Sequence, residues 1–171
     1  MRKIHCLSLI LPVLFVFSAC KKNVASPEPL RDGPGTISVS IDGNTRSFNY
    51  NQDNNSTAKA RLGNRYPNLY ELVVYGQELP GFFYDDLSIT IISRNPIVPG
   101  TYSFDSTEIW YCPATIPLQA CHVSGSSGII TITEMTSSYV KGTFSATLSY
   151  LDNSGVARTN NLTNGKFNGL F

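Results

Sequence analysis

The side chains that could catalyse a reaction are few in this chain. His122 is the only histidine beyond the amino-terminal 20 residues, so a serine nucleophile would have to take it as its base. The stretch 125–128 (GSSG) lacks the spacing of a Gly-x-Ser-x-Gly elbow and is typical of a flexible turn. Two carboxylates about 5 to 9 Å apart would suffice for a glycosidase, and spacing in the sequence does not show whether any two lie so close. The candidate carboxylates are Asp85, Asp105, Glu108 and Glu134.

Two large aromatic residues offer a first place for ligand binding. Trp110 and Tyr111 directly precede Cys112. An exposed aromatic face can stack on a sugar ring or anchor a peptide. The alternative is structural, with one ring filling the core and the other covering the neighbouring loop.

A second aromatic group lies before two acidic residues. Phe82, Phe83 and Tyr84 are consecutive, and successive side chains of an extended segment point to opposite sides, so at least one ring should be exposed. Asp85 and Asp86 follow directly. Calcium needs six or more oxygen ligands, and no spaced acidic loop is present to supply them. We therefore expect these two aspartates to be solvated turn residues and predict no metal site.

The amino terminus has the pattern of a secretory signal. Two basic residues precede an apolar run over residues 4–17, which ends in Ser18 and Ala19. The run is shorter than the roughly 20 apolar residues that a transmembrane helix needs, and a cysteine followed by two lysines ends it. We expect residues 1–19 to be cleaved.

The four residues Phe17-Ser18-Ala19-Cys20 resemble the lipobox of bacterial lipoproteins, in which Leu is more usual at the position of Phe17. The resemblance implies that the Cys20 thiol receives a diacylglyceryl group and that the new amino group receives a further acyl chain such as palmitate. One chain holds a protein to a bilayer only marginally, whereas three form a durable anchor. Secretion without a lipid is the alternative.

The chain after the anchor divides into a tether and one domain. Residues 20–35 comprise the lipidated cysteine and a stretch rich in Pro and Gly with almost no apolar side chains, which cannot bury enough surface to fold. Such a segment would reach about 45 Å from the membrane. Residues 36–171 have the length of a single domain. Cleavage lowers the 13 basic residues to 11, against 12 acidic residues, so no basic surface predicts nucleic-acid binding.

Cys112 and Cys121 are the two cysteines of this domain. In an oxidising compartment they are expected to form a disulfide. Closing so short a loop would stabilise the fold by about 2.5 to 3 kcal/mol. A closed zinc site is the rival interpretation, but one histidine and no further cysteine leave it without enough ligands.

Alternation of apolar and polar residues with period two recurs through the domain, and helical periodicity is hard to find. Asp42-Gly43-Asn44 predicts a hairpin turn, and Phe167 is expected in the core. Eight to ten strands favour an antiparallel β-sandwich, with a β-barrel of the lipocalin kind as the alternative. The expected strands cover residues 36–41, 45–50, 57–62, 69–77, 87–94, 101–104, 129–134, 139–151, 156–159 and 165–171.

The stretches GIITITEM, YVKGTFSATL, LTNGKFNGLF and PGTYSF are similar to small Bacteroidetes lipoproteins of unknown function. The similarity covers most of the domain and consists of strand and turn residues, so it implies a fold and no catalytic residue. Surface lipoproteins of this group often carry an acidic cluster after the cysteine. Lys21-Lys22-Asn23 stands there instead, which favours the periplasmic face of the outer membrane. Asp105-Ser106-Thr107 resembles an O-glycosylation motif of the same group, with Ser106 as the acceptor.

These features predict a lipid-anchored protein of the cell envelope that serves as a non-catalytic binding or assembly module. Its partners would be the membrane and a carbohydrate or protein, and no cofactor is expected. One alternative is a hydrolase of envelope polysaccharide or peptide. Another is a structural subunit of an outer-membrane complex, for which a broad apolar patch would be the sign.

Overall fold

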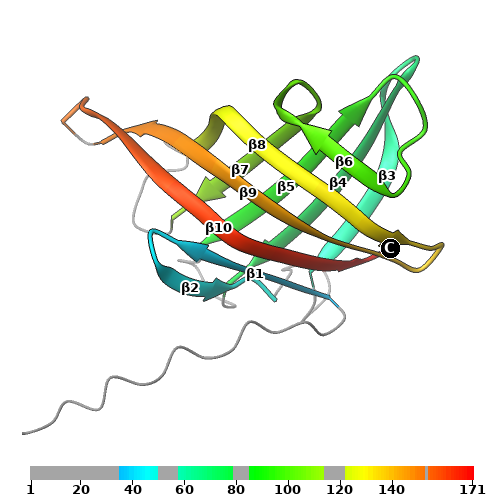
Figure 1. Cartoon of the computed structure of the whole chain (residues 1–171), viewed down its shortest axis with the longest axis horizontal. Helices are drawn as coiled ribbons and strands as arrows, with labels where there is room; N and C mark the ends of the chain where they lie inside the picture. The colour runs from blue at the N-terminus through cyan, green and yellow to red at the C-terminus, as the bar shows by residue number, and fades with distance from the viewer. Residues whose placement is uncertain (1–34, 50–57, 79–84, 114–121, 153) are drawn as a thin grey trace, which may run out of the picture.

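The structure is a computed structural model that describes residues 35–49, 58–78, 85–113, 122–152 and 154–171. These ranges contain ten strands, one short 3-10 helix and no α-helix (Figure 1). None of their helical residues forms a segment long and apolar enough to cross a bilayer. The strands are β1 (Thr36–Ile41), β2 (Asn44–Ser47), β3 (Lys59–Tyr66), β4 (Leu69–Gln77), β5 (Asp86–Ser93), β6 (Gly100–Ser103), β7 (Thr107–Cys112), β8 (His122–Met135), β9 (Tyr139–Leu151) and β10 (Ala157–Leu170), and the 3-10 helix η1 is Phe104–Ser106.

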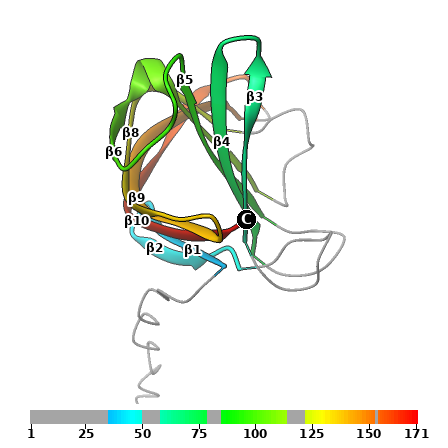
Figure 2. The same cartoon turned by 90° about the vertical axis from the view of Figure 1, so that its right-hand side faces the viewer.

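The strands form one sheet that folds over so that two halves pack face to face (Figure 2). One half runs through β3, β4, β5 and β7, and the other contains β8, β9, β10 and the β1–β2 hairpin. Neighbouring strands are antiparallel except for a single parallel bridge between Leu170 and Lys59, which is the only pairing of β10 with β3 in the described residues. A seam of one bridge does not close the sheet into a barrel. The prediction of an all-β sandwich is therefore confirmed.

The core lies between the two halves and is made by the alternate side chains that each strand points inward. Leu87, Ile89 and Ile91 of β5 are almost completely buried, as period two requires. Phe167 is also buried, as predicted. The other buried apolar residues are Ile37, Val39, Ile41, Phe48, Ala58, Ala60, Leu72, Val74, Ile97, Ile109, Tyr111, Ile130, Ile132, Val140, Phe144, Ala146, Leu148 and Leu162.

The β1–β2 hairpin brings the start of the domain against the end of β4. Asp42 and Gly43 have φ values of 48° and 83°, which is the left-handed geometry of the two-residue turn that the sequence predicted. Beyond the hairpin, Phe48 exchanges backbone hydrogen bonds of 2.7 and 3.2 Å with Ile37. A side chain at Gly76 of β4 would come within 2.5 Å of the Phe48 carbonyl oxygen, so only glycine lets these backbones approach.

Three segments differ from the prediction. β7 was not predicted, although its alternating buried Thr107, Ile109 and Tyr111 carry the period-two signal. Residues 125–128, predicted as a flexible turn, lie within β8, where a bulge interrupts the pairing with β9 between Ser124 and Ser127. The two short strands predicted at residues 156–159 and 165–171 are one strand, β10. A bulge between Leu162 and Gly165 accommodates the polar residues that were expected to separate them.

Candidate functional site

The ends of β4, β5 and β7 meet at one edge of the sandwich and place polar side chains on both faces of the sheet. The register pairs Tyr75 with Ser88 and Ser88 with Trp110 across the three strands. Paired residues of adjacent strands share a face, so these three side chains form a row on the outer surface. Tyr111, one position further along β7, points into the sandwich.

On the inner side, Arg46 of β2 holds two carboxylates. Its Nε donates to Oε1 of Glu78 at 2.8 Å, and its Nη2 donates to Oε2 of Glu78 and to Oδ2 of Asp85. The hydroxyl of Tyr111 donates to the same Asp85 oxygen at 2.6 Å. The hairpin, the end of β4, the start of β5 and the end of β7 are thus joined by one network of charge-assisted hydrogen bonds.

The environment fixes the protonation of this network. The hydrogen bond to Glu78 is the main cause that raises the pKa of Arg46, so the guanidinium stays charged. Burial, followed by the hydrogen bond to Asp85, raises the pKa of Tyr111, which keeps its proton at neutral pH. The cluster joins one guanidinium to two carboxyl groups, so its formal charge is negative.

Two predictions for these residues are settled by their burial. Asp85 is only 9% exposed, so it is not the solvated turn carboxylate that we expected. Tyr111 is 5% exposed, and its ring packs edge-on against Phe48 with centroids 6.2 Å apart at 82°. Tyr111 therefore fills the core, as the structural alternative proposed, whereas Trp110 is 43% exposed on the outer face.

Outer polar groups surround Trp110. Asp86 accepts a hydrogen bond of 2.9 Å from the Tyr75 hydroxyl and another from the amide of the buried Gln77. Glu108 lies two residues before Trp110 on the same strand face, with its carboxylate 3.7 Å from the guanidinium of Arg65. We call the outer surface formed by Tyr75, Asp86, Ser88, Glu108 and Trp110 the Trp110 face.

Burial raises the pKa of the Asp86 carboxyl group. Desolvation is the largest cause of this shift, the nearby Asp85 charge adds to it, and the hydrogen bonds from Gln77 and Tyr75 partly oppose it. The Oε1 atom of Gln77 is buried and has no hydrogen-bond partner among the residues that the structure describes. The edge next to Trp110 thus carries strong hydrogen-bond acceptors.

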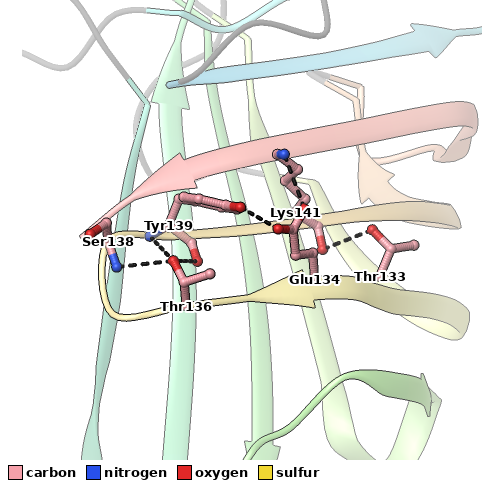
Figure 3. A network of polar contacts seen from close by, with 6 residues as sticks. All are labelled: Thr133, Glu134, Thr136, Ser138, Tyr139 and Lys141. Atoms are coloured by element: carbon pink, nitrogen blue, oxygen red, sulfur yellow. Dashed lines mark hydrogen bonds and ion pairs between the residues drawn. The ribbon is translucent and has the colours of Figure 1, made fainter.

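The predicted candidate Glu134 lies far along the chain at the β8–β9 hairpin. It accepts hydrogen bonds from the Tyr139 hydroxyl and from Lys141 Nζ, the latter at 3.1 Å (Figure 3). These two donors lower the pKa of Glu134, and the Lys141 ammonium also lies 4.6 Å from the centre of the Tyr139 ring. Thr136 closes the turn by accepting from the backbone N–H groups of Ser138 and Tyr139 (Figure 3). These contacts hold the β8–β9 turn in place and pair the Glu134 carboxylate with the Lys141 ammonium group.

A third feature escaped the sequence. Shallow hollows of about 200, 370 and 330 Å³ lie along the outer surface of β8, β9 and β10. Their linings combine hydroxyl and amide side chains with apolar ones, and the exposed Ile129 borders both the second and the third hollow. The polar side chains that line the second hollow are Ser103, Ser127, Ser145, Thr147, Asn161 and Thr163.

The remaining predicted residues divide by whether the structure describes them. Ser106 ends η1 and is half-buried, Asp105 beside it is exposed, and Cys112 is the last residue of β7. No three His, Cys, Asp or Glu side chains within the described ranges gather where they could hold a metal ion. The lipidation, disulfide and glycosylation assignments stay predictions. Cys20, Phe82, Phe83, Tyr84 and Cys121 lie outside the described residues.

Comparison with protein families, curated proteins and solved structures gives no match to this chain. The function is therefore argued from the site itself. The two adjacent aromatic residues before Cys112 pointed to Trp110 and Tyr111, but no sequence signal identified Arg46 and Glu78, which lie 32 positions apart. Only the fold brings their charges together.

Proposed function

We propose that the protein is a lipid-anchored, non-catalytic binding module of the cell envelope. In this proposal Cys20 carries the lipid at the periplasmic face of the outer membrane, residues 21–35 form the tether, and the Trp110 face contacts the ligand. The lipobox-like residues 17–20 and the Pro- and Gly-rich segment after them support the anchoring.

The observation that carries the binding proposal is the exposure of Trp110. Its indole is 43% exposed although β7 pairs on both sides, with β5 and with β8. A tryptophan is among the residues that contribute most to binding when a partner covers them. Because the indole projects from a paired strand, its backbone is already ordered and binding would lose little conformational entropy.

The paired state of the carboxylates supports a non-catalytic role. Asp85, a candidate from the sequence, converges with Glu78, which was not a candidate, and both accept hydrogen bonds from the same guanidinium of Arg46. A carboxyl group that acts on a substrate must come within hydrogen-bond reach of it, and both of these groups already bind the Arg46 guanidinium, while Asp85 also accepts from the Tyr111 hydroxyl. We assign this cluster to holding the hairpin and the three strands together.

The anchor is tested with the variant Cys20→Ala and detergent phase separation of the processed protein. The wild type should enter the detergent phase and show the mass of a triacylated chain beginning at Cys20, and the variant should enter the aqueous phase. A wild-type protein that keeps residues 1–19, or that carries no acyl mass, contradicts the anchoring.

Binding is tested with the immobilised domain and solubilised envelope material. We expect wild-type protein and the control Tyr66→Ala, which removes an exposed aromatic of β3, to retain the same component. Trp110→Ala should lose it at unchanged melting temperature. Equal retention by Trp110→Ala and wild type would show that the ligand contacts another surface.

A further inference from the structure

We infer that the ligand of the Trp110 face is a neutral glycan. This inference rests on the proposed binding function and specifies the chemical class of the ligand. A pyranose ring has an apolar face of C–H groups and an edge of hydroxyl groups. The Trp110 face offers a group for each of these parts. The exposed indole can pack on the apolar face of the sugar, and the hydrogen-bonding side chains of Ser88 and Glu108, which are its neighbours on the same face, can bind the hydroxyl groups.

The geometry follows from the register. Adjacent strands lie about 4.8 Å apart, so the Ser88 hydroxyl is in the next strand to Trp110, and Tyr75 is about 10 Å away beyond it. Glu108 is about 6.7 Å from Trp110 along its own strand. A ring stacked on the indole would therefore have its hydroxyl groups beside a serine hydroxyl and a carboxylate.

The surroundings of Trp110 do not fit an apolar partner. Among the described residues, the other large apolar side chains that are exposed lie outside β4, β5 and β7, so Trp110 is the one large apolar side chain of these three strands that is exposed, in a row with Ser88 and the half-buried Tyr75. A protein or membrane interface of useful size needs a contiguous apolar patch of several hundred Å². These other exposed residues are Leu62, Tyr66, Val98, Ile129, Leu151, Val156 and Phe171.

The charge of the face selects among glycans. Asp86 and Glu108 are acceptors for sugar hydroxyl groups. The Glu108 carboxylate lies 3.7 Å from the Arg65 guanidinium, so Asp86 is the group of this face that would repel a carboxylate or sulfate on the ligand. The inner cluster around Arg46 adds a formal negative charge behind the same strand ends. We therefore expect neutral chains to bind and uronic acid chains to be rejected.

The surface beyond Trp110 favours a chain over a single sugar. Val123 of β8 pairs with Trp110 on one side and with Ser149 of β9 on the other. Thr147, two residues from Ser149 on the same outward face, lines the hollow of about 370 Å³. A glycan that stacks one ring on Trp110 can extend over β8 towards this hollow, where the exposed Ile129 offers an apolar contact and Thr147 offers a hydroxyl group.

The experiment is titration calorimetry of the full domain with β-1,4-linked hexasaccharides of glucose, xylose and mannose, with each monosaccharide, and with a galacturonic acid hexasaccharide. At least one neutral hexasaccharide should bind, about tenfold or more tighter than its monosaccharide and the acidic chain. Trp110→Ala should weaken that binding about 10- to 100-fold, Trp110→Phe less, and Tyr66→Ala not at all.

Two outcomes overturn the glycan inference, namely that no neutral hexasaccharide binds, or that Trp110→Ala binds one as tightly as the wild type. Treating the envelope material in two ways before capture distinguishes a wrong ligand class from a wrong binding function. Envelope material is oxidised with periodate, which destroys sugar diols, or digested with protease before capture. Capture lost only after protease overturns the glycan but leaves the binding function, whereas capture that never depends on Trp110 overturns both.

Discussion

Tyr111 donates a hydrogen bond of 2.6 Å to Asp85, a residue 26 positions earlier in the chain that also binds Arg46. This contact places a phenol, a carboxylate and a guanidinium at the point where β2, β5 and β7 come together. Removing any of the three leaves a partner that has been withdrawn from water, so the cluster should govern the stability of this edge.

Replacement of Arg46 by methionine should lower the free energy of unfolding by about 2 to 4 kcal/mol, because two largely buried carboxylates lose their cation. Arg61→Met is the matched control, since Arg61 binds Glu71 at 3.1 Å from an exposed position. It should cost about 0.5 kcal/mol or less. Urea denaturation gives both values, and equal losses would contradict a stabilising role for the cluster.

Tyr111 should make the fold sensitive to alkaline pH. Its pKa is raised in the folded state, so the folded protein holds the phenolic proton while the unfolded chain releases it near pH 10. The contribution is full below about pH 10 and is lost as the pH rises towards the folded pKa. Melting temperatures between pH 8 and 11 should fall more steeply in the wild type than in Tyr111→Phe. Parallel curves would refute this.

Asp86→Asn should stabilise the protein at neutral pH. Burial raises the pKa of Asp86, so its contribution to stability is full below the unfolded pKa of about 3.9 and declines as the pH rises through the folded pKa. Asparagine is neutral and still accepts from Tyr75. The melting temperature of the variant should exceed that of the wild type at pH 7 and match it more closely at pH 3. A lower value at pH 7 would be inconsistent with desolvation as the main cause.

Two glycines on β9 and β10 are needed because phenylalanine rings cover them. A methyl group at Gly142 would collide with the Thr131 carbonyl oxygen and the Phe167 ring, and one at Gly165 would lie 2.6 Å from both the ring and the carbonyl oxygen of Phe144. Gly142→Ala and Gly165→Ala should each cost about 1 to 3 kcal/mol through overpacking.

Gly63 of β3 provides the control for this pair, because nothing lies within 4 Å of an added methyl group there. Gly63→Ala should leave the melting temperature unchanged or slightly higher. If all three alanine variants melt alike, the rings do not pack on Gly142 and Gly165 as described.

The fold was predictable because burial imposes period two on most strands. The segments 36–41, 69–77 and 139–151 were predicted with their observed bounds, since each alternates and ends in a recognisable turn. Bulges defeat this reasoning. The polar residues before Gly165 were taken for a break, but β10 continues through a bulge whose Asn164 has a φ of 54°.

The candidate site was only half predictable. The sequence offered Trp110 and Tyr111 as a ligand-binding pair or as one core ring and one covering ring, and without a predicted strand at β7 it did not say which ring is buried. Asp85 seemed to be a solvated turn residue, because its partner Arg46 is 39 positions away and only tertiary pairing brings it near. Long-range ion pairs carry no local pattern, and neither does a hollow on a sheet surface.

The most direct test of the Trp110 face uses the fact that the chain has a single tryptophan. Acrylamide quenching of its fluorescence is measured with and without a saturating concentration of the neutral hexasaccharide that binds best. A ligand stacked on the indole should lower the quenching constant about two-fold or more and shift the emission to shorter wavelength. An unchanged quenching constant at saturation would show that Trp110 does not contact the ligand and would contradict the account.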